Sequence, residues 1–363
     1  MTPLDAAALA FLAFKDRRLT AAVMRADAHR ATAEDLDAMP PREPGEPLVH
    51  WACRCRASKR HPLLWRYELD RLIAEADTAL KQAAALNIAT IAIGDARYPP
   101  MLAAIPDPPP LLWAQGQVDA LLQPAVAIVG SRAATPYALT MARQLAVDLG
   151  SAGIVVVSGL ARGVDSAAHH AVVMANGRTV GVLGCGVDRI YPPEGKNLAR
   201  QMQTAGAIVS EFPLRTPPLR HHFPLRNRII SGLSCAVVVI EASEKSGALI
   251  TASAAAEQGR EVMVLPGQAI GGRNRGGHLL IRDGAKVVET AADVLEELAG
   301  AGVWHDRRAP VIASLPQNVD FTVDDVAAET GDPPNVVLAR LLELELAGQI
   351  QRIEGGRFVR VLT

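Results

Sequence analysis

The chain has 363 residues, of which 49% are hydrophobic, and its formal net charge is −1. This length allows one sizeable core with smaller appendages, and the small net charge excludes binding of a polyanion through overall charge, so any such binding must come from local patches. The four cysteines are too few and too scattered for a disulfide framework, which is typical of a reducing cytoplasm.

Residues 1–75 form an alanine-rich N-terminal helical region that is partly irregular. No signal-peptide pattern opens it, and no apolar run of the chain approaches the ~18 residues of a membrane span, so we expect a cytoplasmic protein without membrane contact. Residues 15–62 include proline-rich and basic stretches of low pattern content, which predict disorder or loose attachment. A zinc site is the alternative here, although the spacing departs from known zinc motifs. Its ligands would be His50, Cys53, Cys55 and His61.

The second zone, residues 85–298, alternates short β-branched runs with longer helical patterns. The expected strands are 125–129, 154–158, 179–183, 207–210, 236–241 and 261–265. The expected helices are 137–149, 163–175, 196–204, 225–233 and 248–258. Strands that are apolar on both faces and separated by helices predict an α/β, Rossmann-like, doubly wound and mostly parallel sheet covered on both sides. Such sheets bind ligands at the carboxyl ends of their strands.

The third zone, residues 311–363, follows a glycine- and proline-containing break. A short helix is expected to begin near Thr322, which can cap it, and to end at Gly331. A second helix over 334–347 has apolar residues on one face, and short strands at 350–353 and 357–361 flank a hairpin turn. This order predicts a small C-terminal winged-helix domain. A generic dimerisation domain is the alternative.

Three of the expected strands are followed by glycine and hydroxyl residues directly before a helix. Glycine lets a backbone approach phosphate closely, helix N-termini favour anions, and an arginine can fork onto phosphate oxygens. Three such strand ends on one edge of a sheet predict a phosphate-bearing ligand. The alternatives are that the first glycine only makes a tight turn, that its arginine is a solvated charge, and that the serine of the third site is a plain N-cap. The residues are Gly130, Ser131 and Arg132; Ser158, Gly159, Arg162 and Gly163; and Ser246, Gly247 and Thr251.

Asp165 and His169 lie four residues apart on one helix face, which would suit a metal ion. We instead expect Asp165 to hydrogen-bond the glycine loop and His169 to pack beneath it. No nucleophile, base and orienter occur at a recognisable spacing, and the sequence has no established zinc motif. We therefore predict no catalytic residue, no metal and no cofactor.

Residues 215–228 contain four arginines and no acid. A mononucleotide needs only one or two cations, whereas a basic run with an aromatic residue suits a polyanion whose bases can stack. Phe223 is the expected stacking platform, and the alternative is that it is a core residue under the loop. The residues of this segment expected to bind are Arg220, Phe223, Arg226, Asn227 and Arg228.

Together these motifs closely resemble the DNA-processing protein A (DprA/Smf) family, in order and at the family's spacing from about residue 85 to 298. The matching stretches are 98–100, 105–109, 129–132, 158–165, 191–193, 210–211, 223–232, 246–251 and 265–267. The resemblance does not extend to residues 15–62, where members of the family usually have a small helical domain.

The resemblance implies that the second zone is a Rossmann-like single-stranded DNA-binding domain and that the protein is not an enzyme. It implies a recombination mediator that protects incoming DNA and loads a RecA-type recombinase during natural transformation, and that associates as a homodimer. The family's pocket arginine corresponds to Arg132, and its basic residue and stacking aromatic correspond to Arg220 and Phe223.

Two other functions are weighed against this one. A nucleoside-monophosphate phosphoribohydrolase-like enzyme would share the fold, but residues 245–251 lack the Pro-Gly-Gly-x-Gly-Thr loop and catalytic acid of those enzymes. A regulator of duplex DNA would act through the C-terminal zone.

Overall fold

A computed structural model of the chain describes residues 1–15, 17–28, 39–40, 42–43, 45–57, 64–300, 320–330, 334–346, 350–353 and 356–360. The chain divides into two compact units, Met1–Glu296 and Glu297–Thr363, which are taken separately below. None of the helices in the described ranges combines the length and the apolar character that crossing a bilayer requires.

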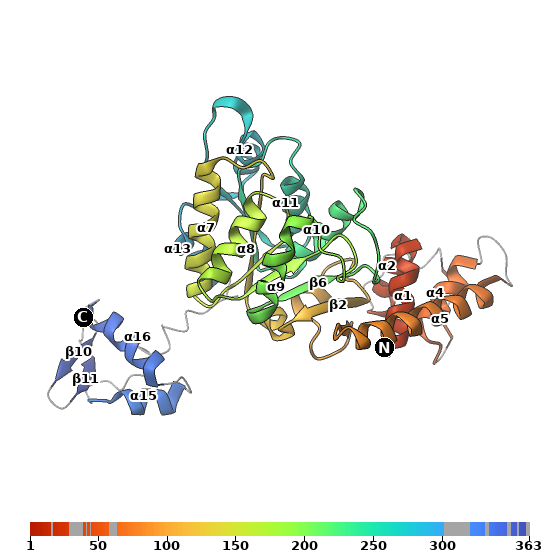
Figure 1. Cartoon of the computed structure of the whole chain (residues 1–363), viewed down its shortest axis with the longest axis horizontal. Coiled ribbons are helices and arrows are strands. Elements are labelled where there is room, and N and C mark those ends of the chain that lie inside the picture. Colours follow the sequence, from red (N-terminus) through yellow and green to blue (C-terminus); the bar gives the residue numbers. More distant parts are fainter. Residues whose placement is uncertain are drawn as a thin grey trace. The chain divides into compact units, whose positions relative to one another are not determined.

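A nine-stranded sheet forms the centre of the first unit, in the order β1-β2-β6-β5-β4-β3-β7-β8-β9 (Figure 1). Strands β3 to β9 pair in parallel, whereas β2 pairs antiparallel with both β1 and β6. The strands are β1 Ala89–Ala92, β2 Leu111–Gly116, β3 Ala125–Gly130, β4 Val155–Ser158, β5 Thr179–Val182, β6 Ala207–Ser210, β7 Ala236–Ile240, β8 Glu261–Leu265 and β9 Lys286–Val287. The predicted α/β fold with a mostly parallel sheet is confirmed.

Helices cover both faces of this sheet because its strands are apolar on both sides. Side chains such as Ala127 and Val129 of β3 pack with α10 and α11 in one core, and the alternating residues face the other side, where α8 contacts β3 and β4. The helices of the unit's centre are α6 Pro100–Ala103, α7 Pro136–Ser151, α8 Val164–Met174, α9 Lys196–Ala205, α10 His222–Gly232, α11 Gly247–Glu257, α12 Arg275–Arg282 and α13 Ala291–Gly300.

The chain reverses its direction of winding at β3, which has β4 on one side and β7 on the other. From β3 to β6 each new parallel strand is added on one side, and β7 to β9 are added on the other side. Such a reversal opens a crevice at the carboxyl ends of the strands. The fold therefore places the ends of β3, β4 and β7 around one position.

Four N-terminal helices pack beside β1 and β2 (Figure 1). They are α1 Pro3–Lys15, α2 Arg17–Asp27, α4 Leu48–Ala57 and α5 Leu64–Ala85. The predicted irregularity is wrong for α2 and α4, because Val23 and Trp51 are buried in a core shared with α1 and α5, and tertiary burial stabilises short helices that propensity alone would not. The thiols of Cys53 and Cys55 are buried in this core. His61 of the zinc alternative lies outside the described residues, as do residues 29–38.

The second unit has the predicted order of two helices and a hairpin. It contains α15 Val323–Thr330, α16 Pro334–Leu346 and the antiparallel strands β10 Ile350–Ile353 and β11 Arg357–Arg360. The Thr322 hydroxyl accepts a hydrogen bond from the Asp325 N–H at 3.2 Å, which confirms the predicted cap. Phe321 and Phe358 are buried in the small core of the unit.

Candidate functional site

An open pocket of about 770 Å³ lies at the carboxyl ends of β3, β4 and β7. We call it the rim pocket. Ten of the residues singled out in the sequence line it: Gly130, Ser131, Arg132, Arg220, Phe223, Arg226, Asn227, Ser246, Gly247 and Thr251. The structure thus brings the end of β3 together with the segment that begins α10 and the loop after β7, which both lie far from β3 in the chain.

Hydroxyl groups hold the turns of the rim pocket in place. The Ser131 hydroxyl accepts a hydrogen bond from the Ala133 N–H at 3.2 Å, and the Ser246 hydroxyl caps α11 by accepting from the Ala248 N–H at 3.3 Å. Ser246 therefore has the N-cap role weighed as its alternative, and the same geometry places the N-terminus of α11 at the pocket. A helix N-terminus with its free N–H groups attracts an anion.

Three exposed cations surround the rim pocket: Arg132, Arg220 and Lys245. Within the described part of the chain, none of the three takes part in an ion pair. Among the described residues, the only carboxylate that lines the pocket is that of Asp165, which is 6% exposed. The accessible surface of the pocket is therefore cationic, although the chain as a whole is nearly neutral.

A buried arginine supports the floor of the pocket. Arg226 is 4% exposed, and its guanidinium donates to the carbonyls of Gly159, at 2.9 Å, and of Val182. Burial lowers the pKa of Arg226 to about 10, against the opposing charge of Asp165, so the guanidinium remains a cation at neutral pH. Arg226 ties the ends of β4 and β5 together, and its hydrogen bonds are directed to the protein.

The two residues considered for a metal ion have the structural roles that we expected. The Asp165 carboxylate accepts from the N–H groups of Gly159, at 3.1 Å, and Ala161, at 3.3 Å. His169 is fully buried with its Nδ1 2.6 Å from the Thr179 hydroxyl. Burial, together with the nearby charge of Arg226, lowers the pKa of His169 to about 3, so the ring is neutral.

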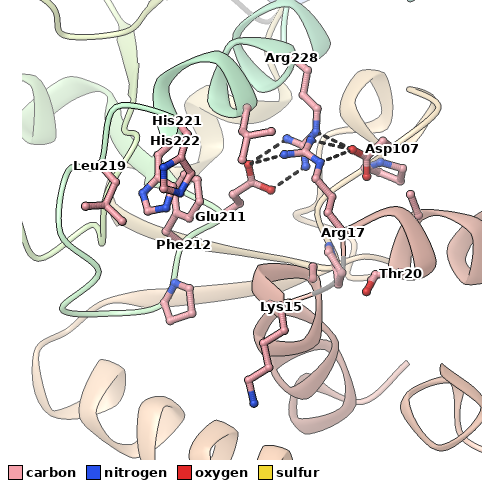
Figure 2. Close-up of a pocket in the computed structure, with 17 residues that line it drawn as sticks. Lys15, Arg17, Thr20, Asp107, Glu211, Phe212, Leu219, His221, His222 and Arg228 are labelled. Atoms are coloured by element: carbon pink, nitrogen blue, oxygen red, sulfur yellow. Dashed lines mark hydrogen bonds and ion pairs between the residues drawn. The ribbon is translucent and has the colours of Figure 1, made fainter. Parts of the chain in front are cut away.

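Arg228 does not line the rim pocket, so the structure does not bring it together with the other residues expected to bind DNA. Figure 2 shows Arg228 pointing toward Glu211 and Asp107, with which it forms ion pairs at 2.6 Å and 3.1 Å. Arg17 of α2 also binds Asp107, at 2.6 Å. Residues two apart on a helix point to different sides, so Arg226 and Arg228 cannot both face one ligand. Arg228 fastens α10 to the N-terminal helices.

The residues predicted after β4 shape the rim without lining the pocket. Ser158 is buried and its hydroxyl donates to the Ile128 carbonyl at 2.6 Å. Gly163 has a φ of 80°, and a Cβ at that position would lie 2.2 Å from the Ser131 carbonyl oxygen. A Cβ on Gly159 would lie 2.5 Å from the Arg226 guanidinium. The exposed Arg162 pairs with Glu194. We therefore assign these four residues to the loop architecture.

Aromatic side chains form one wall of the pocket. The half-buried ring of Phe223 has the Arg132 guanidinium carbon 5.7 Å from its centroid, within the range of cation–π attraction. The ring of Tyr191 lies 5.7 Å from the same ring, centroid to centroid, and is 43% exposed. Sequence reasoning did not assign Tyr191 or Lys245 to the site, although Tyr191 belongs to a stretch that it compared with the family and Lys245 directly precedes another.

Comparisons with known proteins agree with this geometry. A model of the family described as DNA recombination-mediator protein A matches residues 89–299, and a model of the DprA winged helix domain matches residues 306–356. Protein Smf of Escherichia coli is 42% identical over 282 residues, which cover 73% of this chain and 75% of that protein. DNA processing protein DprA of Bacillus subtilis is 43% identical over 220 residues, or 60% of this chain and 74% of that protein.

Two solved structures are also similar. DNA processing protein A from Streptococcus pneumoniae has a TM-score of 0.63 and 36% identity, covering 69% of this chain and 87% of that chain. DNA processing protein A from Helicobacter pylori has a TM-score of 0.54 and 29% identity, covering 60% of this chain and 97% of that chain. The structural work on the Helicobacter protein describes its mode of binding single-stranded DNA.

Proposed function

Because the chain belongs to the DNA recombination-mediator protein A family, whose members are also called DprA or Smf, we propose that it binds single-stranded DNA in the rim pocket. Membership makes the chain a DNA-processing recombination mediator. The proposal adds the kind of strand, the residues that hold it and the partners that receive it.

The observation that carries the proposal is the set of exposed, unpaired cations around an open pocket. Arg132, Arg220 and Lys245 offer three positive charges, and the single carboxylate in the lining is buried. Phosphate contacts of this kind supply affinity without reading sequence. The Helicobacter relative, described for its binding of single-stranded DNA, supports the same assignment.

An aromatic wall favours a single strand over a duplex. In a duplex the bases are paired and stacked inside the helix, whereas the bases of a single strand can stack on protein rings. Phe223 and Tyr191 present such rings beside the cations. We therefore expect little sequence preference and a clear preference for single strands.

The proposed partners follow from family membership. We propose that the bound strand is protected and delivered to a RecA-type recombinase in the cytoplasm during natural transformation, and that the protein acts as a homodimer. Light scattering of the purified chain tests the homodimer, and a strand-exchange assay with the host recombinase tests delivery.

We propose no enzymatic activity for the rim pocket. A phosphoribohydrolase needs an accessible acid beside the bound nucleotide, and within the described residues the only carboxylate lining the pocket is the buried, hydrogen-bonded Asp165. Incubation with adenosine monophosphate should release no adenine. Release of adenine at an enzymatic rate would overturn this part of the proposal.

The deciding experiment compares single- and double-stranded oligonucleotides of one sequence in equilibrium binding across a salt series. We expect the single strand to bind more tightly at every salt concentration, with an affinity that falls as salt rises. Equal affinity for both forms would remove the single-strand assignment, and binding that ignores salt would remove the phosphate contacts.

A further inference from the structure

A second pocket of about 280 Å³ lies next to the rim pocket, between the N-terminus of α7 and the loop after β8. We call it the side pocket. Its lining includes Thr135, Tyr137, Glu241, Gly267, Ile270 and Arg273. One short stretch of chain connects the two pockets, because residues 131–133 line the rim pocket and residues 135–138 line the side pocket. The two linings are therefore separated by a single residue of the chain.

A cation stands at the boundary between the two pockets. The guanidinium of Arg273 donates to the Ala133 carbonyl at 3.2 Å, and Ala133 belongs to the lining of the rim pocket. Arg273 is exposed, and it forms no ion pair within the part of the chain that the structure describes. A phosphate located between the pockets would therefore meet an available positive charge.

An exposed aromatic ring lines the side pocket. Tyr137 is in the first turn of α7, is 49% exposed, and donates its hydroxyl to the Pro266 carbonyl at 3.4 Å. Its polar end is thus held while about half of its surface remains open to a ligand. Ile270, which is 88% exposed, lines the same pocket and adds apolar surface. An anchored ring with open surface is suited to stack on a planar ligand.

The acidic group of the side pocket determines which part of a nucleotide can enter. The Glu241 carboxylate is buried and accepts from the N–H of Thr135, at 3.1 Å, and from the Thr135 hydroxyl. Its negative charge repels a phosphate, but it can accept a hydrogen bond from an N–H of a base. The base therefore belongs inside the pocket, and the phosphate belongs at its edge on Arg273.

We propose that the side pocket holds a nucleobase of the same single strand that occupies the rim pocket. The base stacks on Tyr137, and the phosphate that connects it to the rim pocket lies on Arg273. This proposal rests on the proposed function. It extends the binding path beyond the residues that the family resemblance supplies, along the first turn of α7.

Oligonucleotide length separates the two pockets in an experiment. Oligonucleotides of about 4 and about 16 nucleotides span the site sizes of single-strand grooves, and we expect only the longer one to reach the side pocket. Tyr137→Ala should lower the affinity for the longer oligonucleotide about 5- to 150-fold, which is the effect of losing one stacked base. The affinity for the shorter oligonucleotide should not change. Tyr137→Phe, which keeps the ring and loses the hydroxyl, should retain tight binding. Tyr67→Ala, at a 74% exposed tyrosine of α5, is the matched control.

Arg273→Ala tests the phosphate at the boundary. For the longer oligonucleotide, the slope of log K against log salt should become less steep by about 0.7, which is the contribution of one phosphate contact to a single strand. Arg282→Ala, which removes an exposed arginine near the end of α12, should leave that slope unchanged.

The possible outcomes distinguish this inference from the proposed function. If Tyr137→Ala weakens both lengths equally, or neither, the side pocket holds no base, while wild-type binding to the shorter oligonucleotide still supports the rim pocket. If the wild-type chain binds neither length, the proposed function and the inference are both overturned.

Discussion

Arg132→Ala is the most direct test of the rim pocket. The side chain is exposed, lines the pocket and has no ion-pair partner within the described residues. Its removal should therefore disturb little of the protein's own structure. It takes away one phosphate contact and also the cation next to the ring of Phe223.

The expected loss of DNA affinity in Arg132→Ala has one part that depends on salt and one that depends on it much less. Each phosphate contact to a single strand contributes about 0.7 to the slope of log K against log salt, so three contacts give a slope of about −2.1 and two give about −1.4. When the salt concentration rises fourfold, from about 50 to about 200 mM, the ratio of the wild-type binding constant to that of the variant should fall about 2.6-fold. Loss of the cation–π contact at an exposed ring adds about 0.5–1 kcal/mol, which salt changes less.

Fluorescence anisotropy with a labelled single strand, repeated across the salt series, measures both parts. Arg132→Lys should keep the slope and lose some affinity, because lysine keeps the charge without the forked geometry. Arg178→Ala is the charge-matched control, since Arg178 directly precedes β5 at the opposite edge of the parallel strands. A slope for Arg132→Ala equal to that of the wild type would refute the phosphate contact, whatever the change in affinity.

Other perturbations test the aromatic wall and the ion pairs behind α10. Phe223→Ala should weaken single-strand binding by about 1–3 kcal/mol through lost stacking; an unchanged affinity in a folded variant would make Phe223 a core residue. Arg228→Ala should lower the free energy of unfolding by about 1–3 kcal/mol, because it removes one of the two arginines that bind the partly buried Asp107 and Glu211 and leaves only Arg17. The DNA affinity of the folded variant should not change. Burial alone would raise the pKa of Asp107, but the charges of Arg228 and Arg17 outweigh it and lower the pKa in the folded state. The ionised Asp107 therefore stabilises the fold fully above its unfolded pKa of about 3.9. This stabilisation is lost as the pH falls through the lower pKa of the folded state. Denaturant unfolding from about pH 2 to about pH 6 should show a smaller loss of stability at acid pH for Asp107→Asn than for the wild type. An equal loss would contradict the assignment.

The central strands could be predicted because their sequences are apolar and β-branched on both faces, as buried parallel strands require. The strands β1, β2 and β9, nearest the two ends of the sheet, could not be predicted in this way. β2, Leu-Leu-Trp-Ala-Gln-Gly, has no β-branched residue and follows a run of prolines. Its strand conformation depends on antiparallel pairing with β6 and β1, which is a tertiary contact. Strand preference of this kind reflects the neighbours more than the residues themselves.

The start of α10 shows a similar limit of local reasoning. The sequence places the start of the helix at residue 225, after Pro224, whereas α10 begins at His222. Proline is tolerated in the first turn because the N–H that it lacks has no partner there. Phe223 is consequently part of the first helical turn and not of the preceding loop. Its ring position beside Arg132 and Tyr191 depends on that turn.

The arginines of the site show most clearly what the sequence could not provide. Five were predicted to bind, namely Arg132, Arg162, Arg220, Arg226 and Arg228, and a strand that met all five would give a salt slope of about −3.5. Burial and pairing divide them: Arg226 and Arg228 bind groups of the protein, and Arg162 pairs with Glu194 outside the pocket. Of the five, only Arg132 and Arg220 lack an ion pair or a buried position within the residues that the structure describes, and the exposed Lys245 joins them. A measured slope for a short strand thus decides between the two counts, because about −2.1 fits the three exposed cations and about −3.5 would show that paired arginines release their partners to bind DNA.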